Sequence, residues 1–205
     1  MISKILFALS FIITIVHGHL LIESNNPNDF RWSDCGGQII RFNKLDFEPK
    51  PLVLSETKEL YLTGDISINE DLPLDAEMTI VVNKTLNYDN DPYNITLPCI
   101  DGTFGSCTLK VCDSFKTWYN DLFCPFFQNI GRPCSCPIQA GRVTLNHGRV
   151  TVPFEQFKGF LAQMASGDYN AKFIINNPGH FGPGDNLLAC LMLHARLVEK
   201  PNQQP

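Results

Sequence analysis

Eight cysteines constrain this chain more than any other feature of its sequence. Six of them lie in one stretch from Cys99 to Cys136, and the other two, Cys35 and Cys190, lie near the ends of the chain. No C-x-x-C pair occurs, and the C-x-C at Cys134 is too short for a zinc ribbon or finger. An even number of cysteines at irregular spacing is typical of disulfides in an oxidising compartment. We therefore expect a local group of bridges, one bond that ties the ends of a domain together, and no bound metal.

The first residues of the chain indicate entry into the secretory pathway. Lys4 precedes an apolar run from Ile5 to Val16, and the residues that follow, up to Gly18, offer small or modest side chains for cleavage. A retained membrane anchor is the alternative, but a membrane span needs about 20 apolar residues, more than this run provides. We therefore expect residues 1–18 to be a signal peptide, so that the cysteines oxidise.

The remainder is long enough for one domain with a substantial core. We expect an N-terminal extension at residues 19–29, one domain at residues 30–198 and a polar, disordered tail at residues 199–205. No repeat or low-complexity linker divides the domain. The formal net charge is −5 and Lys and Arg do not cluster, which argues against nucleic acid as a partner.

Short apolar runs with a period of two residues recur along the domain. Such runs, separated by Pro, Gly and Asn, predict antiparallel strands with one buried face. The runs are Leu45 and Phe47, Leu60–Ile68, Ala76–Val82, Tyr93–Leu97, Val150–Phe154, Tyr169–Ile175 and Leu187–Leu197. Seven or eight strands in one domain form a sandwich or a barrel. The sequence therefore predicts an all-β, antiparallel fold.

Two N-x-T sequons begin at Asn83 and Asn94 and are candidate sites of N-glycosylation. If Ile80 points into the fold, the alternation places Asn83 on the outer face of its strand. If Tyr93 and Ile95 point inward, Asn94 points outward in the same way. Two chance tripeptides are the alternative, and the agreement of both sequons with the strand phase makes this alternative weaker.

The period of the apolar pattern changes inside the cysteine-rich stretch. Val111, Phe115, Trp118 and Leu122 are spaced by four, three and four residues, which places them on one face of a helix. We expect this to be the one sizeable helix of the domain. Its aromatic side chains are expected to be part of the core rather than to contact a ligand.

A second apolar segment follows the Val150 run. It contains Phe154, Phe157, Phe160, Leu161 and Met164, with few charged residues between them. One interpretation is a short amphipathic turn packed on the sheet. The other is a mobile lip that touches a membrane or a ligand, because Phe and Met give apolar area that can repack. The residues alone leave both interpretations open.

The sequence carries no recognisable catalytic motif. It contains no G-x-S-x-G, H-E-x-x-H or glycine-rich phosphate loop, and His147, His180 and His194 are scattered. The D-N-D at Asp89 starts like a calcium loop, but Pro92 breaks the pattern where ligands are needed. We expect a protein that is not an enzyme and has no cofactor; a calcium-dependent phospholipase is the remaining enzymatic alternative.

Several motifs together resemble the family of ganglioside activator proteins, over residues 30–197. They are Phe30-x-Trp32-x-x-Cys35, Leu97-Pro98-Cys99, Gly105-Ser106-Cys107, Cys112-Asp113, Cys124-Pro125, Pro133-Cys134-x-Cys136-Pro137, Val152-Pro153 and Gly167-Asp168-Tyr169, with the late Cys190. That family consists of lysosomal sphingolipid activators, which lift gangliosides from membranes and present them to β-hexosaminidase A during glycolipid catabolism. It belongs to a wider lipid-recognition β-sandwich superfamily.

The resemblance implies a cup-shaped β-sandwich with a hollow apolar cavity and a lipid ligand. It implies the disulfides Cys35–Cys190, Cys99–Cys107, Cys112–Cys136 and Cys124–Cys134. The residues predicted to line or flank the cavity are Leu60, Leu62, Ile66, Met78, Ile80, Phe173 and Ile175. By similarity, the segment from residue 157 to 164 is the apolar lip of the cavity. The sequence departs from the family in a longer loop at residues 176–186 and in Phe where the family carries Trp at residues 154–164, which leaves the accepted head group open.

A deep cavity is the arrangement that extraction of a lipid requires. Exposing one acyl chain of about 16 methylenes to water costs roughly 13 kcal/mol, at about 0.8 kcal/mol each. We therefore expect a lipid-binding and transfer protein for a glycosphingolipid or phospholipid, with peripheral membrane contact and a β-hexosaminidase-type partner. The alternative is a secreted recognition or signalling module that binds lipid without transferring it.

Overall fold

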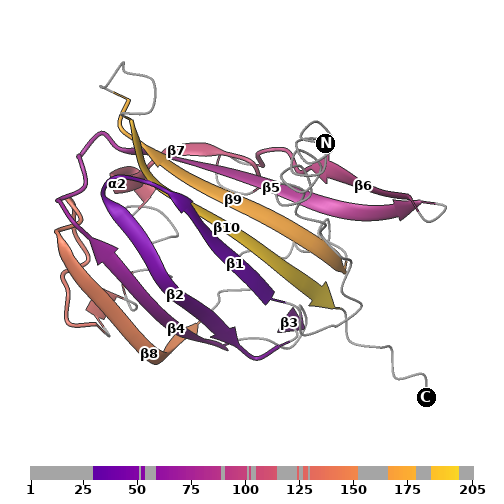
Figure 1. Cartoon of the computed structure of the whole chain (residues 1–205), viewed down its shortest axis with the longest axis horizontal. Helices are drawn as coiled ribbons and strands as arrows, with labels where there is room; N and C mark the ends of the chain where they lie inside the picture. Colours follow the sequence, from indigo (N-terminus) through magenta and orange to yellow (C-terminus); the bar gives the residue numbers. More distant parts are fainter. Residues whose placement is uncertain are drawn as a thin grey trace, which may run out of the picture.

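The computed structural model describes residues 30–50, 52–53, 59–88, 91–100, 102, 105–114, 124, 127–128, 130–151, 166–178 and 186–198. Two sheets dominate this part of the chain, and Figure 1 shows them as two layers. The larger contains, in spatial order, β1 (Phe30–Gly36), β10 (Leu187–Val198), β9 (Gly167–Asn176), β5 (Glu77–Tyr88) and β6 (Asp91–Thr96), with β3 (Leu52–Val53) beside β10 and β7 (Thr108–Lys110) beside β5. The smaller contains β2 (Ile40–Glu48), β4 (Glu59–Ile68) and β8 (Gly141–Thr151).

All strand pairs are antiparallel except the short pair of β3 with β10. The chain passes between the layers repeatedly: β1 is in the large sheet and β2 in the small one, and β4 is in the small sheet while β5 is in the large one. Such crossings are what make two sheets a sandwich with one interior. The predicted all-β antiparallel sandwich is confirmed.

The closely packed core lies at the end of the sandwich where α2 (Val111–Ser114) is found (Figure 1). We call this the packed end, and define it by Ile39, Ile40, Ile68, Leu72, Ala76, Val111, Val143, Leu188 and Ala189. Backbone hydrogen bonds tie its connections together: the amide of Ile39 donates to Leu188 O (3.1 Å) and that of Val111 to Ala76 O (2.9 Å). Gly37 lies against this contact with φ of 142°, and a Cβ there would be 2.6 Å from Leu188 O. A side chain at residue 37 would therefore push β10 away.

Four disulfides join Cys35 to Cys190, Cys99 to Cys107, Cys112 to Cys136 and Cys124 to Cys134. These are the four pairs that the family resemblance implies. The first bridge spans 155 residues and connects β1 to β10 next to the packed end. In the chain-entropy account, a bridge that closes so long a loop removes the most freedom from the unfolded chain. The framework therefore strengthens the end that is already well packed.

The strands differ from the sequence prediction in several places, and β3 and β7 correspond to no predicted run. Phe30–Gly36 forms β1 by pairing with β10, although its short alternation of Phe30 and Trp32 did not enter the predicted runs. Of the run predicted at Val150–Phe154, only Val150 and Thr151 are described, and they end β8, which starts earlier, at Gly141. Val143 and Leu145 are buried in that strand and alternate with the polar Arg142, Thr144 and Asn146, a pattern that the prediction missed.

The predicted helix begins where the apolar stripe begins. The described helix, α2, runs over Val111–Ser114, and Val111 is buried in the core. The rest of the stripe, Phe115, Trp118 and Leu122, lies outside the described residues. So do the predicted signal peptide and N-terminal extension, the C-terminal tail from residue 199, and residues 179–185 of the long loop.

Candidate functional site

The inner face of the large sheet brings four predicted cavity residues together. Met78 of β5 pairs with Ile175 of β9, and Ile80 pairs with Phe173 two residues further along. Side chains of directly opposed residues in antiparallel strands touch, so these four form one apolar surface. Ile80 is buried and the other three are partly exposed.

The facing surface of the small sheet carries the other three predicted residues. Leu60, Leu62 and Ile66 alternate along β4 on the face that also holds the buried Ile68. Ile66 packs against the core, whereas Leu60 and Leu62 lie further along the strand and are only partly buried. The structure thus places the seven residues on the inner faces of two layers, as the alternation predicts.

Burial on these inner faces changes along the strands. Next to the packed end, apolar side chains are inaccessible to solvent, as Ala189 shows with 1% exposure. At the opposite end, which we call the far end, most side chains of the same inner faces are only partly buried; Tyr169 of β9, opposite Ala195, is the buried exception. The far end is defined by Trp32, Phe47, Leu60, Leu62, Leu193, Ala195 and Leu197. Apolar side chains that stay partly exposed between two sheets show that the described residues do not fill the space beside them.

One edge of the sandwich is held closed by the carboxylate of Asp34 in β1. Its Oδ1 accepts a hydrogen bond from the amide of Gly36 (2.7 Å), and its Oδ2 accepts one from the amide of Phe42 in β2 (2.8 Å). Near the far end, the rings of Phe30 and Phe47 meet edge to face with centroids 4.4 Å apart. These contacts fix β1 of one sheet beside β2 of the other, so any opening must lie elsewhere.

The other edge of the large sheet is β6, and here the sequence prediction was wrong about burial. Tyr93 and Ile95 are 48% and 36% exposed, although they lie on the same side of the sheet as the inward-facing Lys84 and Leu86. Among the described strands, β6 is the last of its sheet, and no strand of the small sheet covers this edge. Pro92 was the missed signal, since a proline inside a strand indicates an edge.

A polar pair lies within the inner face near this edge. The Nζ of Lys84 is 5.6 Å from the centroid of the Tyr169 ring, in cation–π range. Tyr169 is almost completely buried, and this burial raises the pKa of its hydroxyl to about 12. The phenol is therefore neutral at any physiological pH and is able to donate a hydrogen bond beside a cation.

The predicted apolar lip lies outside the described residues. This applies to Phe154, Phe157, Phe160, Leu161 and Met164, which therefore stay a prediction. What the structure adds is their place in the chain: they connect the end of β8 in the small sheet to the start of β9 in the large one. A connection between the two layers is a suitable position for a lip over the space between them.

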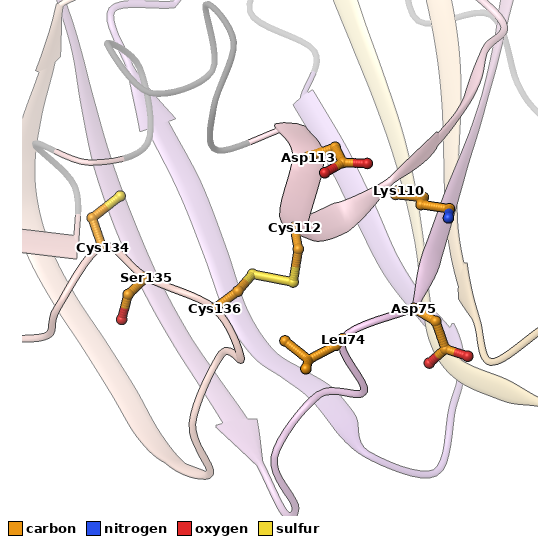
Figure 2. Close-up of a pocket in the computed structure, with 8 residues that line it drawn as sticks. All are labelled: Leu74, Asp75, Lys110, Cys112, Asp113, Cys134, Ser135 and Cys136. Carbon is orange, nitrogen blue, oxygen red and sulfur yellow. A yellow bond between two sulfur atoms is a disulfide. The ribbon is translucent and has the colours of Figure 1, made fainter.

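A separate pocket of about 600 Å³ lies outside the sandwich interior, beside the disulfides. Figure 2 shows the Cys112–Cys136 bridge at its centre, with Lys110, Asp113 and Asp75 around it. Leu74, a further lining residue, is 64% exposed. Charged groups of both signs line this pocket and its leucine is exposed, so it lacks the enclosed apolar lining that an acyl chain requires.

Histidines and carboxylates do not assemble a reaction centre in the described part of the chain. His147 stacks on Tyr61 on the outside of the small sheet, with its Nδ1 3.6 Å from a carboxylate oxygen of Glu48. His194 contacts Asn170 on the outside of the large sheet. Among the described residues, no three His, Cys, Asp or Glu side chains are grouped to hold a metal ion. Nor does this part contain a helix long and apolar enough to cross a membrane.

Comparison with known proteins agrees with this geometry. The family model described as the ML domain matches residues 29–195, which is most of the chain and nearly all of the sandwich. No curated protein matches the sequence significantly. The ML domain is a lipid-binding, non-catalytic domain with an immunoglobulin-like β-sandwich, in agreement with the two apolar inner faces. This chain belongs to the ML domain family of lipid-recognition proteins.

Proposed function

We propose that this protein extracts a glycosphingolipid-like lipid from a membrane, holds its acyl chains between the two sheets, and presents its head group to a lysosomal glycosidase. One observation carries the proposal: most of the apolar side chains on the inner faces are only partly buried at the far end. A domain that needed these faces only for stability would close them, as the packed end does.

The magnitudes favour enclosure over a surface patch. Removing a two-chain lipid from a bilayer costs roughly 26 kcal/mol if the chains reach water, at about 0.8 kcal/mol per methylene. Enclosing the acyl chains between two apolar faces offsets most of this free energy, whereas scattered leucines on the surface offset little of it. Inner-face residues such as Leu62 and Phe173 supply apolar contact from both layers.

The head group belongs at the β6 edge in this proposal. Tyr93 and Ile95 offer exposed apolar area beside the interior, and Lys84 and Tyr169 offer a cation and a neutral hydroxyl next to it. Amphipathic residues of this kind suit the boundary between acyl chains and a polar sugar. The predicted lip at Phe160 would cover the same opening.

Secretory and lysosomal localisation is part of the proposal. Four disulfides support an oxidising compartment, and the N-terminal apolar run supports secretion. Presentation to a β-hexosaminidase-type hydrolase rests on the resemblance in the sequence motifs.

The test is transfer of a fluorescent glycosphingolipid between vesicles by the full chain, with neighbouring substitutions on opposite faces of β9. Phe173→Gln places an amide on the inner face, and Lys172→Gln places the same amide on the exposed outer face. We expect the first to lower the transfer rate about tenfold or more, because a polar group buried against acyl chains costs about 1–3 kcal/mol. The second should leave the rate unchanged.

Circular dichroism must show that both variants are folded. Equal transfer by the two variants would contradict the proposed interior. Phe160→Asp tests the lip separately: unchanged extraction by this variant removes the lip from the mechanism and leaves the interior standing. Binding of lipid without any transfer by the wild-type protein would instead support a recognition module.

A further inference from the structure

The two N-x-T sequons face each other across the β5–β6 pair. Asn83 of β5 is opposite Thr96 of β6, and Thr85 of β5 is opposite Asn94 of β6. The asparagine of each sequon is therefore paired with the threonine of the other. This reciprocal arrangement follows from the register and is not visible in the spacing of the sequence.

A hydrogen bond links each pair, and in both cases the acceptor is the side-chain oxygen Oδ1 of the asparagine. Thr96 Oγ1 donates to Asn83 Oδ1 at 2.7 Å, and Thr85 Oγ1 donates to Asn94 Oδ1 at 2.8 Å. A glycan is attached through the amide nitrogen, Nδ2, and leaves Oδ1 free to accept. Among the described residues, neither Nδ2 is occupied in a hydrogen bond. The Nδ2 atom of each asparagine is therefore available for attachment of a sugar while both hydrogen bonds are kept.

Both side chains lie on the outer face of the large sheet. Asn83 is three residues from the buried Ile80 along β5, and Asn94 lies between the inward-side residues Tyr93 and Ile95. The outer face stays polar beyond them: Asn83 is opposite Asn170 of β9, which contacts His194 of β10 at 3.1 Å. A hydrophilic surface therefore continues from β6 across β5 and β9 to β10.

We propose that Asn83 and Asn94 both carry N-linked glycans, and that the two glycans together cover the outer polar face of the large sheet beside the edge strand β6. An oligosaccharide carried on a lipid diphosphate is the donor. In each transfer a bond forms between Nδ2 and the anomeric carbon, the bond from that carbon to the diphosphate oxygen breaks, and Nδ2 loses one proton as the lipid diphosphate leaves.

The placement has two consequences for the molecule. An edge strand exposes unpaired backbone groups to other chains, and bulky sugars beside β6 would keep such chains away. In addition, a glycan-covered outer face leaves the opposite side of β6, with Tyr93 and Ile95, as the side that is able to approach a membrane. The sugars would thereby set which side of this edge meets lipid.

The test uses the complete chain secreted from eukaryotic cells, measured by intact mass before and after treatment with peptide N-glycosidase. We expect two glycans on the wild-type protein. Thr85→Ala should lose only the glycan of Asn83 and Thr96→Ala only that of Asn94, while Thr85→Ser and Thr96→Ser keep both. Secreted wild-type protein with no glycan or one glycan would overturn the proposal, and so would a chain that is not secreted and carries none.

The outer-face position is tested by lipid transfer with and without glycans. The proposal expects the enzymatically deglycosylated protein to transfer lipid at the wild-type rate. A rate that falls on deglycosylation, with the fold intact, would place the sugars at the interior's opening and contradict the outer-face assignment. If both glycans are present but the protein transfers no lipid, the proposed function fails and this inference stands.

Discussion

The two ends of the sandwich are built from the same strands but are filled differently. In β10, Ala189 is 1% exposed and Leu191 is buried, whereas Leu193, Ala195 and Leu197 of the same face are partly exposed. The apolar alternation continues without a break between them. The apolar alternation therefore shows which face of the strand points inward. Tertiary packing decides whether other side chains cover that face or leave it open to a ligand.

The difference also separates stability from binding. The 155-residue bridge, the core cluster and the tied connections lie at the packed end. The far end is held by the contact of Phe30 with Phe47 along one edge. A protein that accepts a large apolar ligand needs one part that keeps its structure when the other part is empty, and this division provides it.

Removing the long-range disulfide tests whether the packed end carries the stability. Replacing Cys35 and Cys190 by Ala opens a loop of 155 residues and should lower the free energy of unfolding by about 5 kcal/mol. Removing the Cys124–Cys134 bridge, which closes ten residues, should cost about 3 kcal/mol by the same relation. Urea unfolding of both double variants measures the difference, and a larger loss for the short bridge would contradict the account.

Equal truncations at the two ends sharpen the comparison. Leu72, 1% exposed at the packed end, should lose about 3–5 kcal/mol of unfolding free energy on substitution by Ala, because a cavity forms. Leu193→Ala at the partly exposed far end should lose only about 1 kcal/mol, mainly from reduced apolar burial. Thermal unfolding compares the two variants, and similar losses would mean that the far end is packed as tightly as the core.

Enlarging an alanine at each end of β10 is the converse test. Ala189→Leu adds volume to a filled core and should destabilise the fold by about 1–3 kcal/mol. Ala195 lies on the same face between the partly exposed Leu193 and Leu197, and Ala195→Leu should change stability by less than about 0.5 kcal/mol. It should instead reduce lipid uptake by occupying space. Destabilisation of both variants to the same degree would show that the far end has no spare volume.

A substitution on the outer face of the small sheet tests neither end of the interior, and we expect it to have the smallest effect on stability. Arg142 donates to both carboxylate oxygens of Asp65 (2.8 and 2.6 Å), and these hydrogen bonds lower the pKa of Asp65 below its usual 3.8. A depressed pKa contributes stability above pH 3.8, which is lost as the pH falls through the lower value. Asp65→Asn should be slightly less stable than the wild type at neutral pH and equal to it in strong acid. A difference that grows as the pH falls would contradict this sign.

The sequence predicts most of the sandwich because alternation is a local property. The inward face of β5 and β9 follows from Met78, Ile80, Phe173 and Ile175, whose pairing the structure shows. It does not predict β1, whose apolar alternation is limited to Phe30 and Trp32 and which is ordered by pairing with β10. The exposure of Tyr93 escaped prediction for a related reason, since the number of layers covering a strand depends on its place in the sheet.

The candidate site divides in the same way. Residue types and phase identify the inner faces, but the change of burial along them arises from how far apart two sheets lie, which is a property of the tertiary structure. The reciprocal pairing of Asn83 and Asn94 with each other's threonines likewise depends on the β5–β6 register. The sequence indicates which face of a strand a residue lies on, whereas only the tertiary structure shows which residues pair across strands.

Native mass spectrometry of the secreted protein, after incubation with glycosphingolipid vesicles, decides whether the far end holds lipid. The account predicts a complex of one lipid with one protein for the wild type and for Lys172→Gln. It predicts a marked loss of that complex for Phe173→Gln and for Ala195→Leu, with the fold retained. A folded wild-type protein that carries no lipid, or equal binding by all four proteins, would contradict it.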